Sequence, residues 1–135
     1  MTERPALRPP SGGMAPPPTA ALADGTELDL LPLAREITAT HLAGHPEELE
    51  RYGPAVRAWC THDNQHLLNW AALDVAGKVD FDGRLRWLAG VLSARGYPLQ
   101  NLADNLRTAA AVLERRPGES TRAVARRLAS AADSV

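Results

Sequence analysis

Apolar residues recur at every third or fourth position along most of the chain, which is the spacing of one buried face of an α-helix. The clearest stripe lies in residues 99–115 and consists of leucine and alanine: Leu99, Leu102, Ala103, Leu106, Ala109, Ala110 and Leu113. Glycine and proline separate such segments, because glycine ends helices and proline suits their first turn. The pattern predicts helices over residues 32–42, 46–53, 54–76 and 99–115, a helix that Asp80 or Asp82 caps and that runs to Ala94, and a last helix capped by Ser120.

The amino-acid usage favours the same architecture. The chain has 24 Ala and 19 Leu against seven Val and one Ile, and the first two favour helices whereas β-branched residues favour strands. Apolar residues make up 44% of the 135 residues, so one hydrophobic core can form. No connection between the predicted helices needs more than about five residues. The sequence therefore predicts a compact all-α domain of five or six helices.

The first 27 residues differ from the rest. They hold six of the eleven prolines and a Gly12–Gly13 pair. A segment of this composition buries too little apolar surface to offset the entropy lost on ordering. We expect a disordered, Pro-rich tail over residues 1–27 and one folded domain over residues 28–133.

Charge and cysteine content narrow the classes of function. Fifteen Lys and Arg against sixteen Asp and Glu give a net charge of −1, which is not the charge balance of a nucleic-acid-binding domain. The one cysteine, Cys60, can form neither an internal disulfide nor a thiolate zinc site, and we expect it to pack as a small core residue. No apolar run is long enough to span a membrane, and the first ten residues lack the apolar stretch of a secretory signal. We expect a cytoplasmic protein that binds neither nucleic acid nor membrane.

The unusual chemistry lies in the predicted helix over residues 54–76. On a helical wheel, Trp70 falls within about 20° of Trp59, and these rings mark an apolar stripe. Asp63 and His66 fall in the same stripe, within about 40° of Trp59, and His62 lies at its edge. A carboxylate directed into a core is costly unless a partner stabilises it, so these residues are candidates for a site.

Three interpretations of Asp63 and His66 stay open. They can satisfy each other, or groups on a neighbouring helix, as a structural polar network. They can be the polar groups of a ligand pocket walled by the two tryptophans and by Trp87. Alternatively, His62 and His66 can bind a metal, since they stand one turn apart, although the adjacent glutamate of a metalloprotease is missing.

Other features of this helix bear on catalysis and partners. Thr61 and its polar neighbours leave a kink or a helix break near residue 61 open, because such side chains compete for backbone groups. Leu68 lies opposite the apolar stripe on the wheel and is a candidate exposed contact for a partner. The sequence shows no Ser-His-Asp order, glycine-rich phosphate loop or pair of catalytic glutamates. We therefore expect no enzymatic activity and name no catalytic residue.

Three segments carry a resemblance to a known family: PEELERYG at residues 46–53, WCTHDNQHLLNW at residues 59–70, and WLAGVLSARGYP at residues 87–98. Together with the Leu/Ala helix that follows, they resemble the photoglobins, the non-haem, globin-like helical domains of bacterial sensory proteins. The similarity spans residues 41–113, over half of the chain. In the related photocobilins, the globin-like domain holds a linear tetrapyrrole such as biliverdin and is coupled to a cobalamin-binding domain.

The resemblance implies a sensory domain that binds a biliverdin-like tetrapyrrole and signals through a partner protein. It implies pyrrole contacts from Asp63 and His66, and a cofactor-binding set of Trp59, His62, Asp63, His66, Trp70, Trp87 and Tyr97. The resemblance also implies that Arg84, Arg86 or Arg95 would pair with the propionate groups of the tetrapyrrole. The chain has no βαβ region and no Asp-x-His-x-x-Gly motif for cobalamin, so a cobalamin-binding protein would act in trans. A homodimer stays open, and the alternative function is a ligand-free helical adaptor.

Overall fold

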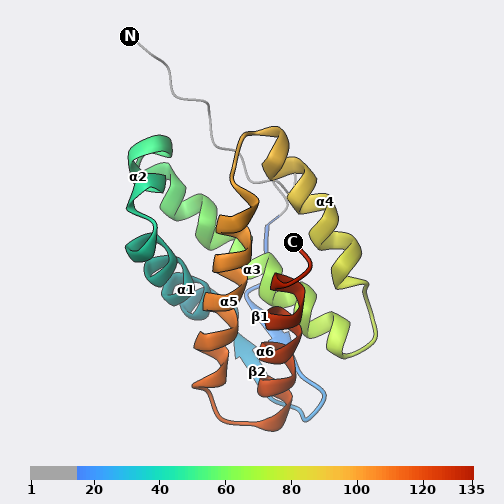
Figure 1. Cartoon of the computed structure of the whole chain (residues 1–135). Helices are drawn as coiled ribbons and strands as arrows, with labels where there is room; N and C mark the ends of the chain where they lie inside the picture. The colour runs from blue at the N-terminus through green and yellow to red at the C-terminus, as the bar shows by residue number, and fades with distance from the viewer. Residues whose placement is uncertain (1–14) are drawn as a thin grey trace.

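The structure is a computed structural model of the chain, and residues 15–135 are the part that it describes (Figure 1). A short hairpin of β1 (Thr19–Ala21) and β2 (Glu27–Asp29) comes first. Six helices follow: α1 (Leu30–Gly44), α2 (Pro46–Tyr52), α3 (Ala55–Val75), α4 (Phe81–Ala94), α5 (Leu99–Glu114) and α6 (Glu119–Ala132). The predicted compact all-α class is confirmed. None of the helices in the described residues is both long and apolar enough to cross a membrane.

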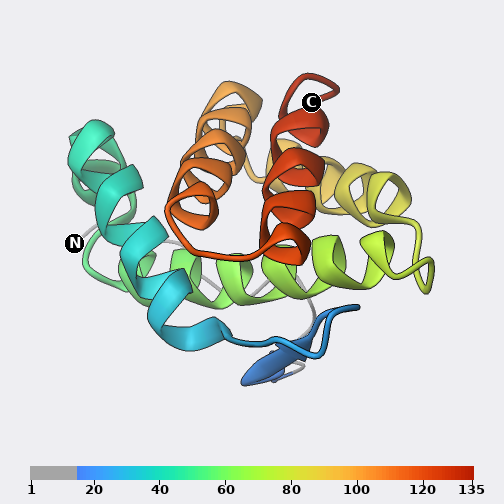
Figure 2. The ribbon, with the colours of Figure 1, turned by 90° about the horizontal axis from the view of Figure 1, so that it is seen from below.

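Helix α3 lies at the centre of the molecule. Figure 2 shows the hairpin on one side of it and α5 and α6 on the other, with α1 crossing its N-terminal half and α4 near its C-terminal half. Because neighbours surround it, α3 buries residues around most of its circumference. Leu68 is fully buried, so the prediction that it is an exposed partner contact is wrong. The helix is continuous through Thr61, whose hydroxyl donates to the Arg57 carbonyl (2.9 Å), so the helix break left open at this point is absent.

The N-terminal hairpin corrects the predicted tail. Residues 19–27 are not disordered: Ala20 pairs with Leu28 in an antiparallel register, and the side chains of Ala20, Leu22 and Leu28 join the hydrophobic core. The Asp24 carboxylate accepts the Thr26 N–H (2.9 Å) and shapes the turn. Residues 1–14 of the predicted tail lie outside the described residues. The folded domain therefore begins before residue 28.

Several helices end or begin at the glycine and proline residues that the sequence indicated. Gly96 has a φ of 78°, a left-handed conformation that glycine adopts without a steric penalty, and it lies between α4 and α5. Asp80 stands at the N-cap position of α4 but makes no side-chain capping bond. The last helix begins at Glu119, so Ser120 lies in its first turn and the prediction of Ser120 as its cap is wrong.

Polar contacts anchor α4 at its start and just after its C-terminus. At the start, the Asp74 carboxylate at the end of α3 accepts the Phe81 N–H and an N–H of Arg127, each at 2.9 Å. Arg127 also pairs with Asp82 at 2.8 Å. Just after the C-terminus of α4, Tyr97 is held by a buried carboxylate on α2. Between these anchors, α4 contributes buried leucines to the core.

Candidate functional site

A row of three rings runs along α3. The ring centroids of His62 and His66 lie 4.8 Å apart, and those of His66 and Trp70 lie 5.6 Å apart. The guanidinium of Arg84, from α4, lies 5.8 Å from the centroid of the Trp70 ring, within the range of a cation–π contact. His66 and Trp70 are buried and His62 is partly buried. Residues four apart meet on a helix surface, which is why the pattern His-x3-His-x3-Trp forms one row.

A carboxylate stands at the other end of this row. Asp63 Oδ1 lies 3.4 Å from Nδ1 of His62, and the Asp63 side chain is 14% exposed. Burial raises the pKa of Asp63, and the hydrogen bond from His62 and the positive charges of His62 and Arg95 only partly oppose this shift. The site therefore joins a carboxyl group that is costly to ionise to a row of aromatic and imidazole rings.

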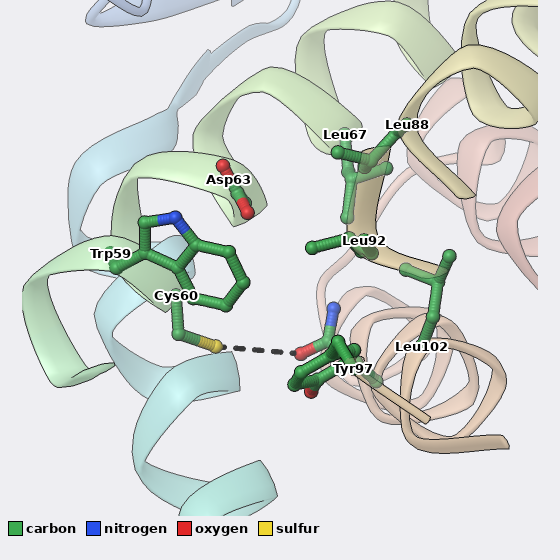
Figure 3. Close-up of a pocket in the computed structure, with 9 residues that line it drawn as sticks. Trp59, Cys60, Asp63, Leu67, Leu88, Leu92, Tyr97 and Leu102 are labelled. Atoms are coloured by element: carbon green, nitrogen blue, oxygen red, sulfur yellow. Dashed lines mark hydrogen bonds between the residues drawn. The ribbon is translucent and has the colours of Figure 1, made fainter. Parts of the chain in front are cut away.

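Asp63 also lines a small, partly open cavity (Figure 3). Figure 3 shows Trp59 and Asp63 on one side and the α4 side chains Leu88 and Leu92 across from them, with Tyr97 nearby. The volume of this cavity is about 20 Å³, room for about one water molecule. The predicted cofactor pocket between α3 and α4 is thus closed to a tetrapyrrole in this conformation.

Trp87 is not part of the cavity wall. It is 49% exposed, on the outer face of α4, so its predicted role as a wall of the pocket is wrong for this structure. The cause is its register: Leu85, Leu88 and Leu92 form the buried stripe of α4, and Trp87 stands outside it. Trp59 and Trp70, by contrast, are buried as the wheel predicted.

Tyr97 belongs to a polar cluster that sequence reasoning missed. Its hydroxyl donates to the buried carboxylate of Glu48 (2.9 Å), which also accepts from Nε2 of His41 (2.6 Å) and from the Asn101 amide (3.0 Å). Burial raises the pKa of Tyr97, and the Glu48 charge adds to the effect. In the sequence, the cluster was indicated only by His41, which lies on the same helix face as the apolar residues Leu33 and Ile37. Glu48 gave no separate signal, because it is one of several acidic residues of the kind that favours a helix N-terminus.

His45 extends this cluster toward α5. Its Nδ1–H donates to the His41 carbonyl (2.9 Å), and its Nε2 lies 3.0 Å from a carboxylate oxygen of Asp104. Partial burial acts to lower the pKa of His45, but the bonds to the His41 carbonyl and to Asp104 outweigh it, and the pKa is raised. Because both ring nitrogens of His45 face hydrogen-bond acceptors, these contacts favour the protonated ring, in which both nitrogens donate.

Metal binding has two candidate locations in the described residues. One donor atom each of His41, His45 and Glu48 lies within 4.8 Å of the others. Both nitrogens of His45 and the Glu48 carboxylate are already engaged in hydrogen bonds, however, so the cluster is accounted for as a hydrogen-bond network. Nδ1 of His41 is its one buried atom without a partner. Among the described residues, the predicted pair His62 and His66 gains no third ligand.

Cys60 packs as a core residue. It is buried between Asn64 and Asn105, and burial raises the pKa of its thiol to about 12, so the reactive thiolate is scarce at neutral pH. The two asparagines exchange amide hydrogen bonds of 2.7 and 3.3 Å and thereby join α3 to α5. The prediction of Cys60 as a small core residue is confirmed.

Comparison with known proteins adds no relative to this description: no protein-family model matches the chain, and neither does any curated protein or any solved structure.

Proposed function

We propose that the chain is a non-enzymatic sensory domain that binds a biliverdin-like linear tetrapyrrole between α3 and α4 and signals through a partner protein. One observation carries the proposal. The row of His62, His66 and Trp70 lies along α3, with the Arg84 guanidinium at one end and the buried Asp63 carboxyl at the other. The resemblance of residues 41–113 to photoglobins also implies that these residues contact the tetrapyrrole.

The side chains of this row suit the polar edges of such a ligand. A bilin carries pyrrole N–H groups that a carboxylate or an imidazole can accept, and two propionates that guanidinium groups can pair with. Asp63 accepts from the pyrroles and His66 supports it, while Arg84 and Arg95 face the propionates. His62 to Trp70 spans about 12 Å along the helix axis, which is the scale of several linked rings.

The small volume of this cavity adds a condition to the proposal. Since it holds about 20 Å³, whereas ligand pockets usually have about 300–1,000 Å³, α4 has to move away from α3 for the ligand to enter. The anchors at Asp74 and Tyr97 resist this movement at the two ends of α4. Movement of α4 on binding is then the signal that a partner detects. A cobalamin-binding protein acting in trans and a cytoplasmic location are parts of this proposal.

The test is titration of biliverdin into the purified chain, followed by visible absorbance. Losing one charge-assisted hydrogen bond costs about 1.5–3 kcal/mol, so Asp63→Ala should weaken binding about 10- to 150-fold and shift the absorption band. Arg84→Gln should weaken binding less, because an exposed guanidinium is screened by solvent. Asp133→Asn, at an exposed carboxylate far along the chain, is the matched control and should change neither quantity.

Two outcomes would contradict the proposal in different ways. If the wild-type chain shows no saturable binding, the sensory function fails. If Asp63→Ala binds biliverdin with the same affinity and the same absorption spectrum as the wild-type chain, tetrapyrrole binding is supported but Asp63 is not part of the binding site.

A ligand-free helical adaptor is the second candidate, and the exposed Trp87 favours it. A tryptophan that is 49% exposed on the outer face of α4 is the type of side chain that anchors protein–protein contacts. This function needs no cavity, and it would remain if biliverdin does not bind.

A further inference from the structure

An open groove of about 740 Å³ lies between α1 and the N-terminal half of α3. Its volume is within the range of small-molecule sites and far exceeds that of the cavity beside Asp63. The apolar part of its surface includes Leu31 and Ala58, and Thr61 and Gln65 supply hydrogen-bonding groups. The groove thus combines an apolar surface with polar groups, as ligand sites do.

The charge in the groove has one sign. Arg35 of α1 and Arg57 of α3 both line it, and none of the described lining residues is acidic. Glu36, next to Arg35, is paired instead with two arginines after α5. Within residues 15–135, neither lining arginine forms an ion pair with a carboxylate. Among residues 15–135, two cations without an ion-pair partner therefore flank the hollow, although the chain as a whole is close to neutral.

The backbone adds to this positive potential. Helix α3 has 21 residues and begins at the groove, where Pro54 lines the hollow at the N-cap position. No side chain caps this end, and its first turn contains no acidic residue. The N-terminus of a helix carries a partial positive charge, which favours an anion. At this helix the contribution is the dipole, because Pro54 has no N–H and the Val56 and Arg57 N–H groups donate to the Gly53 and Pro54 carbonyls (3.1 and 3.3 Å). The helix end and the two arginines are independent features that favour the same ligand charge.

We infer that this groove binds a small organic anion, with its acidic head between Arg35, Arg57 and the N-terminus of α3 and its apolar body against Leu31 and Ala58. His62 lines this groove and also stands at one end of the row proposed for the tetrapyrrole. The groove lies between α1 and α3, however, and neither Arg35 nor Arg57 belongs to that row, so the inference does not depend on the proposed function. The shared chemistry of the ligand is a carboxylate, sulfonate or phosphate group on an apolar body.

The experiment uses 8-anilinonaphthalene-1-sulfonate as the anionic probe and N-phenyl-1-naphthylamine as its uncharged counterpart, with fluorescence titration of the full chain. The anionic probe should bind saturably and at least tenfold more tightly than the neutral one. Arg57→Gln and Arg35→Gln should each weaken the anionic probe about three- to tenfold, because exposed charge contacts are screened, and should leave the neutral probe unchanged. Arg122→Gln removes an exposed arginine on α6 and should have no effect.

Arg84→Gln separates the two sites. If it weakens the anionic probe while Arg57→Gln does not, the probe sits between α3 and α4 and the inference is overturned. Equal binding of the two probes, or no saturable binding, also overturns it. Competition with phenyl phosphate and with phenylacetate then identifies the acidic head. Displacement by either supports the inference, and displacement by neither overturns it.

Discussion

Single residues of this protein differ in how far their surroundings can be predicted from the sequence. The wheel placed Asp63 and His66 on an inward face because one helix determines direction, and both are largely buried. It could not give their partners, which come from other elements. Glu48 shows the limit: its three partners lie on α1, in the connection before α5 and on α5 itself, so no local pattern distinguishes it from the exposed Glu47.

The burial of Asp63 gives a prediction for stability. Its pKa is raised, so the ionised form costs the folded state free energy; that cost is absent below the unfolded-state pKa near 3.8 and present at neutral pH. Asp63→Asn should therefore raise the free energy of unfolding at pH 7 by on the order of 1 kcal/mol, and the gain should shrink toward pH 3.5. Urea unfolding at the two pH values measures it. A less stable variant at pH 7 would mean that the contacts to His62 and Arg95 outweigh burial.

Secondary-structure elements were predicted well where their pattern is local. Helix α5 begins at Leu99 as expected, since its apolar stripe is continuous and proline precedes it. The hairpin was missed because prolines dominate the composition of the segment before residue 28. Its signal was the Asp24–Gly25 pair between Leu22 and Leu28, a turn sequence that favours hairpins even in a Pro-rich context.

The hairpin should contribute to the stability of the helical domain. Leu22 and Leu28 are 8% and 7% exposed and belong to the core. Leu22→Ala and Leu28→Ala should each lower the free energy of unfolding by about 2–3 kcal/mol, because a buried leucine is replaced by a cavity. Glu27→Ala, on the exposed face of β2, should change it by less than about 0.5 kcal/mol. Denaturant unfolding compares them, and equal stabilities would show that the hairpin does not pack on the core.

At the scale of the whole molecule, the sequence indicated the class of fold but not the volumes between the helices. One helix pattern cannot show how closely α4 approaches α3, and so the predicted pocket is a cavity for one water. For the same reason, the groove between α1 and α3 was missed: a wheel of one helix gives no information on which residues of α1 lie beside Arg57. Packing distances are a property of the assembled helices.

The junction of α1, α2 and α5 should make global stability depend on pH. The pKa of His45 is raised, so its contribution is complete below the unfolded-state pKa near 6.5 and is lost as the pH rises through the folded-state pKa. His45→Gln should remove about 1 kcal/mol at pH 5.5 and less at pH 8.5, as expected for a cationic histidine at a helix C-terminus. Urea unfolding across this range tests it, and Asp104→Asn should flatten the same dependence. Parallel pH profiles for wild type and His45→Gln would contradict the assignment.

The amide pair of Asn64 and Asn105 has a mechanical consequence. Each side chain donates to the other across α3 and α5, and both are buried. A slide of one helix past the other by a turn, about 5.4 Å, would break both of these hydrogen bonds in the core, at a cost of about 1–3 kcal/mol for each group left unsatisfied. The Asn64 amide also donates to the Thr38 hydroxyl (3.1 Å), which links α3 to α1 as well. A piston-like shift of α3 against α5 is thereby disfavoured. The pair makes these two helices a fixed frame, and any switching of this domain has to come from elements that tilt against that frame.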